Sequence, residues 1–197
     1  MRTFGLAAAG LISILTGCEP SPVSAPAPAR DEPAAPRDQI DNPQYQSWAR
    51  FPKGTTVIHR SVTRTDGTEG ETVTTTTYTL VEMTPERTVV EVQNSTRRYD
   101  GLETRNPPAK YTHPRRIAGP PGGTPAESKD EGEEKLLVSG REYHTRWHKT
   151  KDRNEAGEVF AQVWSSAEVP GSLVKSVMRT PAVGKTTVTE LVEVRSP

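Results

Sequence analysis

The feature that most constrains this fold is a run of four threonines at 74–77, inside a stretch of mainly β-branched side chains from 71 to 83. Such residues lose side-chain freedom in a helix and pack well on a pleated strand, so the stretch predicts a long β-strand. Similar stretches separated by turn residues recur at 55–65, 88–94, 136–138, 142–150, 158–165, 173–179 and 185–194. This pattern predicts consecutive antiparallel strands.

Amphipathic helical periodicity is lacking, apart from one or two turns near 44–51. A sheet without covering helices must curl, close or stack on itself to bury one face. We therefore expect an all-β, mainly antiparallel fold: a strongly curved meander, or a half-barrel or barrel-like sheet, of eight to ten strands. Only 32% of the residues are hydrophobic, which predicts a small core.

The N-terminus has the organisation of a bacterial export signal. An apolar segment from 4 to 15 follows Arg2; it is too short to span a membrane but suits a signal peptide. It ends in Leu15, Thr16, Gly17 and Cys18, and this cysteine is the only one in the chain. Together these residues resemble the lipobox of bacterial lipoproteins. The resemblance implies that residues 1–17 are a signal peptide and that Cys18 carries acyl chains such as palmitate. The alternative is an ordinary signal peptide with an incidental cysteine.

The anchor predicts an address in the cell envelope. One acyl chain binds a membrane only marginally, so stable anchoring needs at least two chains. The residue after the cysteine is Glu19 rather than aspartate, which by the sorting rule of this family favours the outer membrane, facing the periplasm, over the inner membrane. Residues 18–44 form a Pro- and Ala-rich linker, predicted to be a disordered, extended stalk. The β-rich domain then spans 45–197.

The segment at about 106–134 interrupts this domain. It is rich in proline, glycine and charged residues. It contains two proline pairs, at 107–108 and 120–121, and the acidic run 127–134. Such a composition lacks the apolar residues that a core strand needs. We expect a long mobile loop between two β-rich halves.

Aromatic residues of the second half are the candidate contacts for a hydrophobic ligand. Within 159–164 apolar residues occupy both faces of the expected strand, with Phe160 and Trp164 on the same side. Together with Trp147 and Tyr143 they form an apolar set that a ligand, a protein partner or the loop could cover. The alternative is that they belong to a second layer of a filled barrel.

Catalytic, metal and cofactor sites are not predicted. The sequence Gly184-Lys185-Thr186-Thr187 lacks the earlier glycine and the following helix of a phosphate-binding loop. On a strand, His144 and His148 would lie ~13 Å apart, too far to share one zinc ion. Nucleophilic catalysis lacks a candidate, because the one cysteine carries lipid. With 25 basic and 25 acidic residues, nucleic acid is not an expected partner.

The lipobox, the stalk and a Thr/Val-rich domain containing Trp164, Pro170-Gly171 and Lys175 resemble β-rich bacterial envelope lipoproteins, among them the LolA/LolB-like lipoprotein-localisation half-barrels. The expected function is therefore a membrane-anchored envelope lipoprotein with a non-catalytic binding or interaction domain. Its expected partners are the membrane, through Cys18, and a hydrophobic ligand or an envelope protein. The alternative is a LolA/LolB-like carrier of lipid or lipoprotein acyl chains. A hydrolase stays open, because a catalytic triad needs no sequence motif.

Overall fold

The structure is a computed structural model that describes residues 39–119, 130–155 and 157–197. The predicted signal peptide, the lipobox residues Leu15, Thr16 and Gly17, the lipidation site Cys18 and most of the linker lie outside these residues. Within the described ranges, helices of the length and apolarity needed to cross a membrane are absent.

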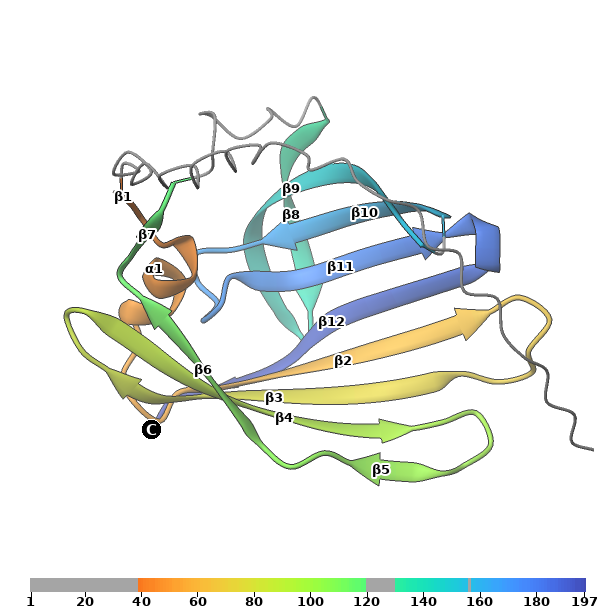
Figure 1. Cartoon of the computed structure of the whole chain (residues 1–197), viewed down its shortest axis with the longest axis horizontal. Helices are drawn as coiled ribbons and strands as arrows, with labels where there is room; N and C mark the ends of the chain where they lie inside the picture. Colours follow the sequence, from red (N-terminus) through yellow and green to blue (C-terminus); the bar gives the residue numbers. More distant parts are fainter. Residues whose placement is uncertain (1–38, 120–129, 156) are drawn as a thin grey trace, which may run out of the picture. The chain divides into compact units, whose positions relative to one another are not determined.

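The domain is built on one open, antiparallel sheet of ten strands (Figure 1). The first half supplies five of them: β2 (Thr56–Thr65), β3 (Thr72–Met83), β4 (Arg87–Arg97), β5 (Glu103–Arg105) and β6 (Ala109–Pro114). The second half supplies the others: β8 (Glu131–Val138), β9 (Arg141–Asn154), β10 (Gly157–Ser165), β11 (Leu173–Thr180) and β12 (Lys185–Arg195). The prediction of an all-β, mainly antiparallel fold with eight to ten strands is confirmed.

The two halves are separate meanders that join side by side. The strand order is β5-β4-β3-β2-β12-β11-β10-β9-β8. Strand β6 pairs with the first part of β4, 87–92, and β5 pairs with its last part, 95–97. The last strand, β12, therefore pairs with the first long strand, β2, and joins the meanders. Strands β2, β3 and β4 pair over most of their lengths, as the β-branched runs in their sequences favour.

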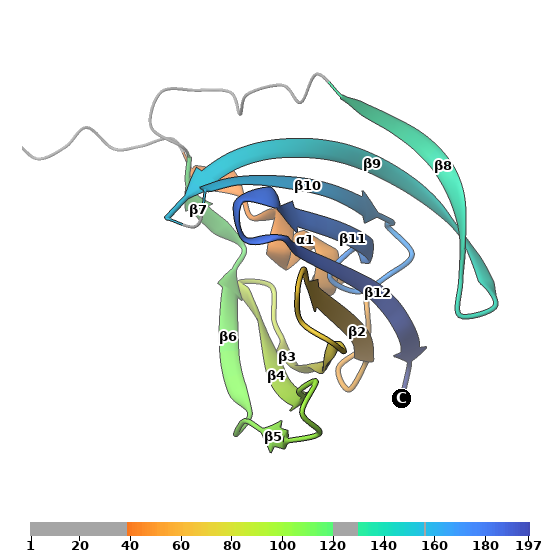
Figure 2. The same ribbon diagram turned by 90° about the vertical axis from the view of Figure 1, so that its right-hand side faces the viewer.

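One short helix lies inside the curve of this sheet (Figure 2). Helix α1 (Pro43–Ala49) begins after Asn42, whose side chain accepts a hydrogen bond from the Gln44 amide, and proline occupies the first turn. The side-chain amide of Asn42 also donates to the Pro114 carbonyl, and its backbone amide donates to the Arg115 carbonyl, which fixes the start of the helix beside β6. The predicted helical turns near 44–51 are confirmed.

The core lies between α1 and the sheet, and it is small, as the composition predicts. Trp48 of α1 is 4% exposed and packs with aliphatic side chains of the sheet. The other most deeply buried apolar members of this core are Val57, Leu80, Val90, Val169, Val174 and Leu191. The turn at 169–171 joins the core from the second half, and Gly171 has a positive φ of 76°, which glycine adopts without strain.

The segment expected to be one long loop, 106–134, contains strands. Strand β6 runs along β4, the short strand β7 (Arg116–Ala118) pairs with β1 (Gln39–Asp41), and β8 begins at Glu131. The charged residues of β8 are exposed to solvent, and two of them lie beside opposite charges of β9: Glu133 lies 3.7 Å from Arg146, and Lys135 lies 2.8 Å from Glu142. Residues 120–129 lie outside the described part of the chain.

Candidate ligand-binding site

A hollow of about 560 Å³ lies between α1 and the strands that face it. We call it the α1 hollow. Its lining comes from α1, from β2, β3, β4 and β6, and from the turn before β11. The residues that line it are Gln44, Trp48, His59, Thr76, Tyr78, Val90, Val92, Asn94, Tyr111, His113, Pro170, Gly171 and Leu173. Its size and its mixture of aromatic, aliphatic and a few polar groups are typical of small-molecule sites.

Sheet register places the polar groups of the hollow in one row. His59 of β2 pairs with Thr76 of β3, and Thr76 pairs with Asn94 of β4. Side chains of directly paired residues point to the same face of a sheet, so the three stand side by side. The preceding row of the same face, Val57, Tyr78 and Val92, is aromatic and aliphatic. The face therefore changes from apolar to polar between two neighbouring rows, which lie two residues apart along each strand.

His59 is the most constrained of these polar side chains. It is 5% exposed, and its Nε2 lies 2.9 Å from the carbonyl oxygen of Leu173. Because that carbonyl accepts, Nε2 carries the proton, and burial holds the pKa of His59 below its usual value while the Leu173 hydrogen bond partly offsets this. In the neutral ring Nδ1 is then an acceptor. It is buried and has no hydrogen-bond partner among the described residues.

Asn94 presents a second acceptor of this kind, because its buried Oδ1 also has no partner among the described residues. Leaving a buried acceptor unpaired costs about 1–3 kcal/mol. Two such atoms in one row place unpaired polar groups beneath the floor of the hollow.

The other titratable groups of the hollow are held neutral. Burial, together with the neighbouring Tyr111 hydroxyl, raises the pKa of Tyr78 above its usual value. Burial also lowers the pKa of His113. The ring of Tyr78 meets that of His59 edge-on, with 5.6 Å between centroids. The hollow is thus an uncharged site near neutral pH.

The 169–172 turn closes one edge of the hollow against the helix. The Gly171 amide donates to the Ser47 carbonyl of α1 at 3.2 Å. A Cβ atom at Gly171 would lie 3.2 Å from the Trp48 ring, so glycine allows both the close approach and the positive φ. This contact joins α1 to the second half of the chain.

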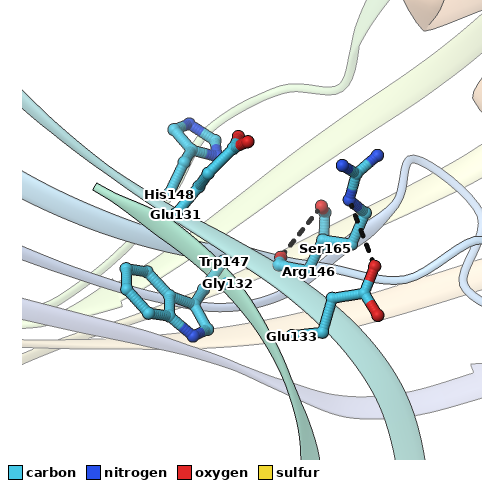
Figure 3. Close-up of a pocket in the computed structure, with 7 residues that line it drawn as sticks. All are labelled: Glu131, Gly132, Glu133, Arg146, Trp147, His148 and Ser165. Atoms are coloured by element: carbon cyan, nitrogen blue, oxygen red, sulfur yellow. Dashed lines mark hydrogen bonds and ion pairs between the residues drawn. The ribbon is translucent and has the colours of Figure 1, made fainter. Parts of the chain in front are cut away.

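A second, more polar hollow of about 460 Å³ lies at the β8–β9 edge (Figure 3). Glu131 and His148 point to one side of the strands and Trp147 to the other. The ring of Trp147 lies over Gly132, where a Cβ atom would approach it to 2.8 Å. Among the residues that line this hollow, Arg146 and Glu133 form an exposed ion pair, and exposed pairs of this kind contribute little.

The structure places the predicted aromatic contacts outside the α1 hollow. Tyr143 and Trp164 are buried, and the Trp164 ring donates a hydrogen bond to the Glu134 carboxylate. Phe160 is 39% exposed and, with Trp164, lines a separate hollow of about 510 Å³. Trp147 lines the β8–β9 hollow. These four side chains are not gathered into one site, and their role as ligand contacts stays a prediction.

Sequence reasoning missed the residues of the α1 hollow. His59 gave no signal because its partner, Leu173, is 114 residues away in the chain. Tyr78 and Thr76 were assigned to a strand, and alternation along that strand was the available clue that they share a face. His144 and His148 lie on β9, as expected, and groups of three or more metal-ligating residues do not occur in the described ranges.

No protein-family profile matches the chain, and no curated protein matches it in sequence. Among solved structures, it is similar to an exported protein candidate with a YmcC-like fold from Bacteroides fragilis, with 8% identity, a TM-score of 0.46, and coverage of 80% of this chain and 100% of that one. A candidate lipoprotein from Parabacteroides distasonis has 11% identity, a TM-score of 0.44, and coverage of 79% and 100%. A candidate outer-membrane lipoprotein-sorting domain from Vibrio parahaemolyticus has 9% identity, a TM-score of 0.25, and coverage of 72% and 84%. Similarity of this degree establishes neither family nor function.

Proposed function

We propose that this chain is a lipid-anchored envelope lipoprotein whose β domain is a non-catalytic binding module with its ligand in the α1 hollow. One observation carries the proposal: the hollow joins an aromatic and aliphatic wall to a row of polar side chains, His59, Thr76 and Asn94. An amphipathic molecule with an apolar part and hydrogen-bond donors fits both.

The groups of the hollow are suited to binding rather than to acid–base catalysis. A general base works best with a pKa near the working pH and with access to the proton it removes. His59 has its Nε2 hydrogen committed to Leu173, and its Nδ1 is buried. Tyr78 has a pKa raised further from neutrality. These properties hold a ligand in a neutral, hydrogen-bonding environment.

The anchor is the second part of the proposal. Acyl chains on Cys18, palmitate among them, would tether the domain to the membrane after removal of the signal peptide 1–17, and the linker would hold it clear of the lipid surface. Glu19 supports an outer-membrane location facing the periplasm. Labelling cells with a palmitate analogue tests this: wild-type protein is labelled and Cys18→Ala is not. Unlabelled wild-type protein would contradict the anchor.

The apolar part of the lining favours a second candidate, a carrier of lipid or lipoprotein acyl chains. Trp48, Val90 and Val92 would suit an alkyl chain. An alkyl chain alone, however, would cover the polar side chains of Thr76 and Asn94 without forming hydrogen bonds to them. The polar row therefore favours the amphipathic ligand.

Native mass spectrometry of the full chain, extracted from its own membranes in detergent, distinguishes these possibilities. Thr76→Trp fills the hollow, whereas Thr77→Trp places the same side chain on the opposite face of the same strand and serves as the control. Wild type and Thr77→Trp should carry the same bound mass, and Thr76→Trp should lack it.

Three results would count against the amphipathic ligand. A wild-type chain without bound mass, or a Thr76→Trp chain that retains it, would contradict the site. A bound fatty acid or phospholipid, whose head group is charged, would instead identify a carrier.

A further inference from the structure

We propose that the sheet face next to the α1 hollow binds a neutral sugar chain through two rows of hydroxyl side chains. This inference deepens the proposed function, because it names the chemical class of the donor-bearing part of the ligand. The first row is Thr96, Thr74, Ser61 and Thr189, and the second is Thr72, Thr63 and Thr187. Both rows lie on the same face as His59, further from α1.

The hydroxyl groups of these rows are held in fixed pairs across neighbouring strands. Ser61 and Thr189 are 2.8 Å apart. Thr63 and Thr187 are 2.9 Å apart, and Thr74 and Thr96 are 3.0 Å apart. In each pair one hydroxyl donates to the other, which leaves the second hydroxyl hydrogen and further lone pairs available. Each pair therefore offers a donor and an acceptor together, as the hydroxyl groups of a sugar require.

Charge is separated between the two faces of these strands. On the face that carries His59, five strands present no lysine, arginine, aspartate or glutamate over their central parts. These parts are 57–63 of β2, 72–80 of β3, 90–96 of β4, 174–178 of β11 and 187–191 of β12. Within these ranges the charged residues, Arg60, Glu91, Lys175 and Glu190, occupy the opposite face, and Lys185 borders the second row on the His59 face. A charged ligand would lose water on this face without gaining an opposite charge, so the face selects an uncharged one.

The remaining features of the face also fit sugar rings. Each threonine presents a methyl group beside its hydroxyl, which matches a ring with both C–H and O–H groups. The side chains are half-buried rather than fully solvated. Where the rows meet the α1 hollow, Thr76 adds a further hydroxyl side chain, and Tyr78 and Tyr111 present aromatic surface.

The test uses the acylated full chain in detergent and an array of glycans. The neutral probes are hexamers of maltose-, cellulose-, mannan-, xylan- and chitin-type sugars, and the acidic probes are polygalacturonate and polysialate. Thr74→Val with Thr96→Val removes two paired hydroxyls while keeping the side-chain shape. Thr75→Val with Thr77→Val makes the same change on the opposite face of β3 and is the control.

Wild type and the control variant should bind at least one neutral glycan, and the Thr74/Thr96 variant should bind it about tenfold more weakly, as the loss of one or two hydrogen bonds implies. Binding confined to acidic glycans, binding to none, or an equal loss in the control would overturn the inference. If glycans fail while the native mass spectra still show a mass displaced by Thr76→Trp, the proposed function stands and only the sugar assignment falls.

Discussion

Gly171→Ala tests whether the turn before β11 holds α1 in place over the sheet. Gly171 has a φ of 76°, and a Cβ atom there would lie 3.2 Å from the ring of Trp48. Trp48 is 4% exposed, so its ring has little room to move aside. The substitution therefore has two costs, one from the backbone conformation and one from the contact.

A matched glycine separates the two costs. Gly67 has nearly the same φ, 75°, but a Cβ atom there would meet nothing within 4 Å. Gly67→Ala should lower the free energy of unfolding by about 1–2 kcal/mol, the cost of a left-handed backbone for a residue with a Cβ. Gly171→Ala should lower it by that amount and by roughly 1–2 kcal/mol more from overpacking.

Urea unfolding of both variants, followed by tryptophan fluorescence, measures the difference. Gly171→Ala should also weaken ligand retention in native mass spectra, because Trp48 and Gly171 both line the α1 hollow. Gly67→Ala should leave retention unchanged. Equal losses of stability in the two variants would refute the contact with Trp48 as the device that fixes the helix.

Two further predictions concern protonation and the β8 edge. Burial holds the pKa of His59 below its usual 6.5, so the unfolded chain takes up more protons than the folded one as the pH falls through 6.5. Urea titrations at pH 7.5 and 5.5 should therefore show wild type losing more stability on acidification than His59→Gln, and equal losses would contradict the buried neutral ring. Gly132→Ala would bring a Cβ atom to 2.8 Å from the Trp147 ring, and it should lower the unfolding free energy by about 1–3 kcal/mol in the same assay, whereas an unchanged value would show that the ring moves freely.

The long strands could be predicted because their side chains specify them locally. The β-branched run 74–77 lies within β3, and the expected strand at 185–194 is β12, Lys185–Arg195. Strand β8 could not be predicted from composition, since its charged side chains are exposed and its backbone pairing with β9 defines the strand. Strand β6 was missed for the same reason, because its partner β4 supplies the ladder.

The α1 hollow was beyond sequence reasoning because long-range register creates it. The row of His59, Thr76 and Asn94 forms only when three strands align, and the Leu173 carbonyl reaches His59 from the other half of the chain. The helix start was more accessible, since Asn42-Pro43 is a recognisable cap sequence. The alternation of side chains along β3 likewise showed that Thr72, Thr74 and Thr76 share a face. The hydroxyl rows themselves could not be predicted, because they form only when β3 pairs with β2 and β4.

Hydrogen–deuterium exchange of the full chain, with its bound ligand and after extraction of that ligand, tests the location of the site most directly. The ligand-bound chain should show slower exchange in α1, in β3 near Thr76 and in the turn at 169–172, all of which border the α1 hollow. Exchange along β8 and β9, which border the other hollow, should stay the same. A change confined to β8 and β9, or none in α1 and β3, would contradict the assignment of the α1 hollow as the binding site.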